Sequence, residues 1–403
     1  MTFLIRPARL PLSRRTFLAA TGSVVAWAGL PRVASAASRD PRLVVVILRG
    51  ALDGLAAVPP IGDPDYAALR GDLAVGASGR EAALPLDGFF ALNDAMPNLH
   101  RRYHEGDALI VHATATGYRE RSHFDGQDVL ENGMPAPGAE RTGWLNRAVA
   151  ALPTEGRIAP ASGLAISPTV PLILRGAAPV VTWMPPDFRP ARSDTVQRLL
   201  DLYALQDPEL ARVFAAGIDI DAMAMGGMAG GDADAFNEIA DGAAKLLVEP
   251  EGPRIAVLSY NGWDTHTNEG VEEGRLADLL VALDGALETL ATGIADIWSD
   301  TVIAVVTEFG RTAAGNGNDG TDHGTATTAF LLGGAVAGGR VIADWPGVRA
   351  DQLYEGRDLY PTTDLRAVLK GVLRDHLGLS EPVLYTSVFP DSIGIRPIDG
   401  LIA

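Results

Sequence analysis

The sequence predicts an α/β fold in which a mostly parallel central sheet is flanked by helices. Short, continuously apolar and β-branched runs recur along the chain, each bounded by Gly, Pro or polar residues. Runs of this kind are typical of strands that are buried on both faces. Segments with apolar residues at helical spacing separate these runs, and strands that alternate with helices indicate α/β architecture.

Five runs carry the strand prediction. They are LVVVIL (43–48), ALIVHA (108–113), PVVTW (179–183), RIAVLS (254–259) and TVIAVVT (301–307). Because these runs are apolar throughout, we expect helices on both sides of the sheet.

Three segments between or after these runs are predicted to be helical. Residues 192–216 and 271–298 place leucines three and four positions apart, as one face of a helix requires. A last helix over 363–377 opens with Thr363 and Asp364, which are suitable capping residues. The Gly/Ala/Met-rich stretch near 217–232 is predicted to be a mobile loop, and no composition shift divides residues 37–403 into separate domains.

The N-terminal segment predicts an export signal rather than part of the fold. Arg14 and Arg15 precede Phe17, an apolar run reaches Leu30, and Ala34-Ser35-Ala36 supplies a cleavage pattern. This order indicates a twin-arginine signal over residues 1–36; the alternative is a buried N-terminal helix. We expect export by the twin-arginine machinery to the periplasm or the exterior. The apolar run is too short to span a bilayer, and no membrane span is expected in the mature chain.

The net negative charge of the chain bears on which classes of partner it can bind. The formal charge of the whole chain is −17, and removal of the five arginines of the signal, which contains no acid, takes it to −22. So acidic a chain is not expected to bind nucleic acid, which needs clustered Lys and Arg. A small anionic substrate stays possible, because the charge inside a cleft can differ from the average. Cysteine is absent, so any metal must be held by Asp, Glu, His or backbone oxygen.

Acidic residues and histidines follow the predicted strands. Ligands of open α/β sheets bind at the carboxyl ends of the strands, and several residues that could bind one are found there. They are Asp53, Ser122, His123, Asp264, His266, Glu308, Asp322 and His323. Mixed imidazole and carboxylate ligands favour Zn²⁺ or Mn²⁺ over Ca²⁺ and Mg²⁺. We therefore expect a divalent metal here; the alternative is an acidic cleft with hydrogen-bonded histidines.

Three polar residues that follow the predicted strands suggest chemistry on an anionic ester. Ser122 can open a helix as its N-cap, and a hydroxyl beside a metal is also suited to attack a phosphoryl or sulfuryl centre. Arg121 and Arg311 could clamp the anion, although arginines next to acids are equally often ion pairs.

Several longer motifs resemble one family. They are LVVVILRGALDGL, DPDYAALR, YRERSHFDGQDVLENG, GWLNRA, NGWDTH, TEFGRT, GTDHGTATTAFLLGG and PTTDLRAVLKGVL. Together with the export signal they resemble the DUF1501 family of exported bacterial proteins, over nearly all of the mature chain. That family looks like a branch of the alkaline phosphatase/sulfatase superfamily, whose fold carries one or two divalent metals and a Ser, Thr or Cys nucleophile at a helix start.

The resemblance implies roles for the listed residues. Asp53 is similar to the superfamily's first-strand metal acid, Asp264 and His266 look like its Asp/His metal pair, and His323 resembles its late metal histidine. Glu308 falls where an Asp-His pair normally ends a strand. The sequence departs from the pattern at Phe309, where a second histidine is expected, and this puts a complete two-metal site in doubt.

These observations predict an exported metal-dependent hydrolase of a phosphate or sulfate ester. The predicted metal ligands are Asp53, Asp264, His266, Glu308 and His323. Ser122 would be the nucleophile, His123 would protonate the leaving group, and Arg121 or Arg311 would hold the anion. The alternative is a non-catalytic exported binding or assembly protein with a degenerate cleft. A metal-independent serine hydrolase is disfavoured, because no Gly-x-Ser-x-Gly motif is present.

Overall fold

The computed structural model describes residues 39–76, 83–152, 163–185 and 232–403. Pro41–Ala403 form the larger unit of the chain, and of the residues before it the structure describes only Arg39 and Asp40. The predicted export signal, the predicted helix 192–216 and nearly all of the loop near 217–232 lie outside the described residues.

A nine-stranded sheet forms the centre of the larger unit, in the order β10-β4-β9-β8-β1-β7-β5-β6 with β11 beside β4. Its strands are β1 (Arg42–Arg49), β4 (Ala108–Ala115), β5 (Gly163–Ile166), β6 (Val180–Trp183), β7 (Ile255–Asn261), β8 (Thr301–Thr307), β9 (Thr327–Leu332), β10 (Arg340–Ile342) and β11 (Thr363–Asp364). Only β9 runs against the others, which confirms the predicted mostly parallel sheet. A separate antiparallel pair joins β2 (Ala83–Pro85) to β3 (Ala91–Asn93).

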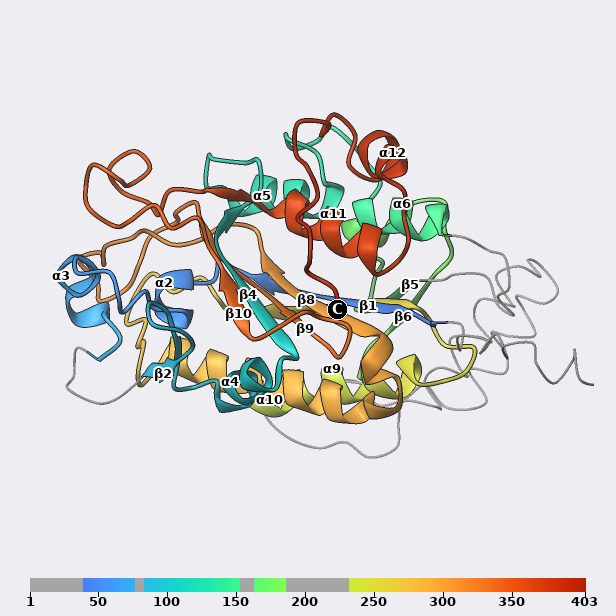
Figure 1. Ribbon diagram of the computed structural model, residues 1–403, viewed down its shortest axis with the longest axis horizontal. Coiled ribbons are helices and arrows are strands. Elements are labelled where there is room, and N and C mark those ends of the chain that lie inside the picture. The colour runs from blue at the N-terminus through green and yellow to red at the C-terminus, as the bar shows by residue number, and fades with distance from the viewer. Residues whose placement is uncertain (1–38, 77–82, 153–162, 186–231) are drawn as a thin grey trace, which may run out of the picture. The chain divides into compact units, whose positions relative to one another are not determined.

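Helices cover both faces of this sheet, as the apolar runs predict (Figure 1). Within the described residues, the α-helices are α2 (Gly54–Ala57), α3 (Tyr66–Arg70), α4 (Pro97–Glu105), α5 (His123–Asn132), α6 (Trp144–Ala151), α9 (Asp232–Leu247), α10 (Arg275–Gly293), α11 (Leu365–Asp375) and α12 (Glu381–Val383). In Figure 1, α4, α9 and α10 lie on one face of the sheet, and α5, α6 and α11 lie on the other.

Strand β1 shows how the two faces are filled. Successive side chains of a strand point to opposite faces, and Val44, Val46 and Leu48 belong to the apolar cluster that includes α9 and α10. Leu43 and Val45 belong to the cluster that includes α6 and α11. A fully apolar strand is therefore what a sheet covered on both faces requires.

Two of the predicted helices are present in the structure, and only their ends differ from the prediction. Helix α10 begins at Arg275 rather than near 271, because Gly274 before it has a φ of 127°, a value outside helical geometry. The chain beyond α10 continues as a 3₁₀ helix from Ala295 to Asp300. Helix α11 is capped as predicted, because the Asp364 carboxylate accepts a hydrogen bond from the backbone N–H of Arg366.

The shared strand direction places the polar loops at one edge of the sheet. Strands β1, β4, β7 and β8 all end at this edge, and the antiparallel β9 begins there. The loops that leave it include every residue predicted for the site. None of the helices that the structure describes is long and apolar enough to cross a membrane.

Candidate metal centre

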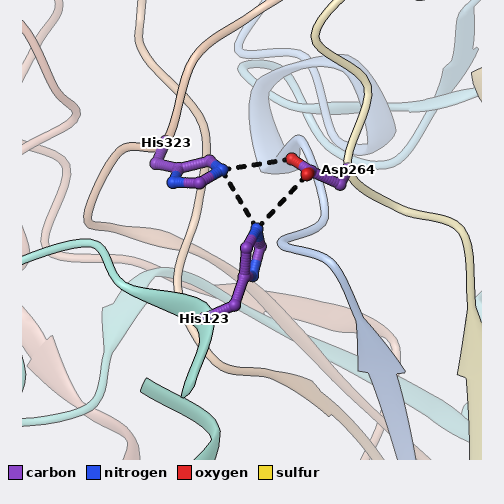
Figure 2. A group of neighbouring side chains, drawn as sticks. All are labelled: His123, Asp264 and His323. Atoms are coloured by element: carbon purple, nitrogen blue, oxygen red, sulfur yellow. Dashed lines mark hydrogen bonds and ion pairs between the residues drawn. The ribbon is translucent and has the colours of Figure 1, made fainter. Parts of the chain in front are cut away.

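Three segments far apart in the sequence bring three histidines and one aspartate together at this edge. His123 is the first residue of α5, which follows β4. Asp264 and His266 lie in the segment after β7, and His323 lies between β8 and β9. Figure 2 shows His123, Asp264 and His323 pointing toward one another.

The ligand atoms of these side chains converge on a small volume. His323 Nε2 lies 3.0 Å from His123 Nε2, 2.9 Å from His266 Nε2 and 3.2 Å from Asp264 Oδ1. His266 Nε2 is 3.0 Å from Asp264 Oδ1, and His123 Nε2 is 3.4 Å from Asp264 Oδ2. The ligand atoms of His123, Asp264 and His323 all lie within 4.8 Å of one another.

Each imidazole contacts an oxygen through its other ring nitrogen. His123 Nδ1 lies 2.8 Å from Glu308 Oε1, and His266 Nδ1 lies 3.1 Å from Asp322 Oδ1. The Nδ1 of His323 lies 2.9 Å from the backbone carbonyl oxygen of Arg121.

These contacts fix which nitrogen of each ring carries the proton. A carbonyl oxygen and an ionised carboxylate can only accept hydrogen bonds, so each Nδ1 donates. Hydrogen bonds, the one from Asn316 foremost, lower the pKa of Asp322. Burial raises the pKa of Glu308, but the hydrogen bonds from His123, Gln127 and the backbone outweigh it and the net pKa is lowered. Both carboxylates are therefore ionised.

In their neutral forms, the three imidazoles therefore direct lone pairs toward one another beside a carboxylate, although the hydrogen bond with Glu308 raises the pKa of His123. Neutral rings in this tautomer present an unprotonated Nε2, and lone pairs about 3 Å apart repel each other unless a cation lies between them. Histidines that bind a metal through one nitrogen commonly donate the other N–H to a carboxylate or a carbonyl oxygen. The residues therefore fit a divalent metal, and His123, Asp264, His266 and His323 are the side chains that could hold it.

Glu308 lies behind His123 rather than among the converging atoms. Its side chain is fully buried, and its oxygens also accept hydrogen bonds from Gly50 N at 2.9 Å, from the Gln127 amide at 3.1 Å and from the Thr307 hydroxyl at 3.0 Å. Its acceptor positions are therefore engaged by donors within the protein. The resemblance placed Glu308 among the metal ligands, whereas its contacts give it the role of orienting His123.

Asp53 is engaged elsewhere. It is buried, it caps α2 by accepting hydrogen bonds from Leu55 N and Ala56 N, and it forms an ion pair with Arg70. Arg70 is itself buried, and no feature of the sequence singles it out. The acid predicted as a first-strand metal ligand therefore already has a fixed cation as its partner.

Both arginines predicted to hold the anion are paired with carboxylates. Arg311 is buried and donates to Asp264 Oδ1 at 2.5 Å and to the Thr321 hydroxyl at 3.0 Å. Burial raises the pKa of Asp264, but the hydrogen bond and charge of Arg311 outweigh it, so the net pKa is lowered. Arg121 donates to Asp358 at 2.7 Å and to Glu355 at 2.6 Å.

Ser122 is the N-cap of α5, but its side chain makes no capping hydrogen bond. The residue is partly exposed, and its backbone N–H donates to the Tyr118 hydroxyl at 3.3 Å. The predicted capping position is present, while the hydroxyl is not used to cap the helix.

Phe309 occupies the position where the resemblance leads one to expect a second histidine. Its ring lies 4.9 Å from that of His123 and 5.4 Å from that of His323, measured between centroids. An apolar wall against two of the imidazoles restricts their rotation and supplies no ligand.

A cavity of about 940 Å³ lies beside the cluster. Asn316 lines it and links it to the cluster, because the Asn316 amide donates to the backbone oxygen of His266 at 2.9 Å and to Asp322 at 3.2 Å. The cavity lining also includes Asp72 and Asp319, so it is better suited to an uncharged or cationic group than to an anion.

The sequence does not indicate that His123 Nε2 meets His323 and Asp264, nor which oxygen atoms contact the Nδ1 atoms of the three rings. The Glu308 and Asp322 carboxylates are close to the predicted ligands in the sequence, but the pattern does not show which side of a ring they face. Asp358 gives no signal at all, because it lies in a loop far along the chain from its partner Arg121.

Comparison with known proteins agrees with the family predicted from the motifs. Residues 108–385 match the model of the family described as "Protein of unknown function (DUF1501)", which confirms the predicted resemblance. No curated protein matches the chain.

Solved structures with a similar chain path include sulfatases and phosphodiesterases. One is Ps i-CgsB in complex with k-i-k-neocarrahexaose, with a TM-score of 0.44, 11% identity, and coverage of 89% of this chain and 77% of that one. The PsFucS1 sulfatase from Pseudoalteromonas sp. gives a TM-score of 0.41 and 14% identity, and covers 98% of this chain and 77% of that one. The murine ectonucleotide pyrophosphatase/phosphodiesterase 5 in complex with AMP gives 0.31 and 12%, with coverage of 67% and 57%. Likenesses this distant assign no activity to this chain.

Proposed function

The chain belongs to the DUF1501 family, and from the geometry of its histidine cluster we propose that it is a metal-dependent hydrolase of a phosphate or sulfate ester. One observation carries the proposal: three imidazoles, each with its Nδ1 beside an oxygen atom, direct their Nε2 atoms toward the Asp264 carboxylate. The donor set of three nitrogens and one carboxylate favours Zn²⁺ or Mn²⁺.

The proposed ligands are His123, Asp264, His266 and His323. A divalent ion bound there would polarise the ester oxygens and lower the pKa of a hydroxyl that approaches it. Arg311 holds the Asp264 carboxylate in place, and Phe309 excludes water from one side of the His123 and His323 rings. In this assignment His123 is a ligand rather than the acid that protonates the leaving group.

Ser122 is the proposed nucleophile. Its hydroxyl is free of the capping bond that a serine in this position usually makes, and it is adjacent in the chain to the ligand His123. The uncharged part of the ester would occupy the cavity beside Asn316, since the acidic lining disfavours the anionic group there.

Turnover of aryl phosphate and aryl sulfate esters by the Zn²⁺- or Mn²⁺-loaded protein tests the proposal. We expect hydrolysis that a chelator abolishes, and that Ser122→Ala lowers by at least about 100-fold while the metal stays bound. Ser380→Ala is the matched control, because Ser380 is also a helix N-cap without a side-chain capping bond.

The competing function is a non-catalytic exported binding protein that keeps the metal. The pairing of Arg121 and Arg311 with carboxylates favours it, since neither guanidinium is free to hold an anion. Stoichiometric metal with no turnover of either ester class, in the wild type as well as in Ser122→Ala, would decide for this function.

We further propose that residues 1–36 direct export through the twin-arginine route and that residues 37–403 are the mature, single-domain protein. The expected result of Arg14→Lys/Arg15→Lys is loss of export, measured by fractionation of the producing cell. Export of this variant at the wild-type level would contradict the proposed route.

A further inference from the structure

Arg121 has an unusual backbone conformation next to the cluster. Its φ is +61°, in the left-handed region that residues with a Cβ adopt at a cost. Such conformations persist where the surrounding structure imposes them, and they concentrate at functional sites. In this conformation the carbonyl oxygen of Arg121 accepts the hydrogen bond from His323 Nδ1 at 2.9 Å.

The Arg121 side chain is paired with two carboxylates. Its Nε donates to Asp358 Oδ2 at 2.7 Å and its Nη2 to Glu355 Oε2 at 2.6 Å, while the guanidinium lies 5.9 Å from the centre of the Tyr354 ring. The Asp358 side chain is fully buried, so its contact with Arg121 is shielded from water and has a defined geometry.

His323 links the other two histidines of the cluster. Its Nε2 contacts the Nε2 atoms of both His123 and His266. If its Nδ1 lost the carbonyl acceptor, the proton could move to Nε2, and that nitrogen could then no longer bind a metal.

We propose that the Arg121–Asp358 ion pair is a positioning device that fixes the tautomer of His323 through the Arg121 carbonyl oxygen. The inference rests on the metal site proposed above, and it gives Arg121 a role different from holding the substrate anion. Asp358 is thereby a positioning residue that does not itself touch the metal.

The test is the affinity of the purified, correctly folded protein for Zn²⁺, measured by competition with a chelator. Loss of a partner that orients a metal ligand commonly lowers metal affinity by about 10- to 100-fold, and we expect this for Asp358→Asn and for Arg121→Ala. Arg121→Gly should lose less affinity than Arg121→Ala but should not reach the wild-type value, because glycine adopts positive φ without strain and has no side chain to pair with Asp358. Asp351→Asn, which breaks the exposed Arg349–Asp351 pair, is the control.

The tautomer itself provides a second readout that a purely structural role would not change. In metal-free protein with ¹⁵N-labelled histidine, the His323 signal should report a proton on Nδ1 in the wild type and a mixture of tautomers in Asp358→Asn. Wild-type affinity and an unchanged tautomer in both Asp358→Asn and Arg121→Ala would overturn the inference and leave the metal site standing. If the wild type does not bind Zn²⁺, the proposed metal site fails and this inference fails with it.

Discussion

The carboxylate of Glu308 illustrates how a residue that the sequence places near a site can make contacts that the sequence does not show. It follows directly after a buried strand, where a metal ligand is expected. However, four donors surround its carboxylate, and His123 is one of them. Sequence position indicates the edge of the sheet, whereas the packing around each group determines which side of a ring it meets.

Replacing Glu308 with glutamine tests its role in orienting His123. The glutamine has the same shape but no charge, and its amide can place an N–H against the His123 N–H, so the unprotonated Nε2 is no longer enforced. We expect Zn²⁺ affinity to fall by about 10- to 100-fold, as measured by chelator competition.

The buried Glu131 supplies a matched control, since it also lies in the hydrogen-bond network of Arg49 and Gln127. Glu131→Gln should lower stability without a comparable loss of affinity. Equal losses of affinity in the two variants would mean that Glu308 acts only through the fold.

The pKa of a second acid, Glu269, determines how the free energy of unfolding should depend on pH. Glu269 is buried, and burial, with a further contribution from the Asp53 charge, raises its pKa to about 8. The unfolded chain releases this proton near its ordinary pKa of 4.5, so the folded protein binds one proton more between these values. The free energy of unfolding should therefore fall as pH rises through this range, by up to about 1.4 kcal/mol per pH unit.

Urea unfolding of the metal-free protein between pH 5 and 8 measures this slope. Glu269→Gln should flatten it, because glutamine does not titrate. Glu105→Gln, which changes an exposed acid, should leave it as in the wild type. A slope that is the same in all three proteins would show that another group is responsible.

At the scale of elements, the cluster forms because the segment between β8 and β9 lies close to the segment that follows β7. The Thr321 N–H donates to the Thr265 carbonyl at 3.1 Å, and a Cβ added to Gly320 would lie 2.5 Å from the carbonyl carbon of His266. The sequence shows a glycine-flanked Asp-His pair here, but it does not show that one of those glycines touches the partner segment.

Gly320→Ala should therefore separate His266 from His323. We expect both a lower thermal midpoint and a loss of metal affinity, because the added methyl group meets backbone that has no room to move. Gly317→Ala, in the same segment but with nothing within 4 Å of its added Cβ, should leave both quantities close to wild type. If the two variants behave alike, the close approach does not position the ligands.

At the scale of the whole molecule, the sequence predicts the architecture well because the sheet is buried on both faces. Each strand then has to be apolar throughout, and that signal is visible in LVVVIL and TVIAVVT without any alignment. Shared strand direction also brings the loops with Asp264, His266 and His323 to one edge. The pairing of Asp53 with Arg70 and of Arg121 with Asp358 was not predictable, because each joins residues whose proximity depends on the tertiary fold.

The central claim is that the three histidines and Asp264 bind one divalent metal ion. Elemental analysis of the protein purified after native export tests it most directly, alongside Asp264→Ala/His323→Ala and, as a control, His100→Ala/His104→Ala on the exposed face of α4. We expect about one Zn or Mn per chain in the wild type and in the control, and none in the Asp264→Ala/His323→Ala variant. A wild-type protein without metal, whose thermal midpoint does not rise on addition of Zn²⁺ or Mn²⁺, would contradict it, as would metal that the Asp264→Ala/His323→Ala variant retains.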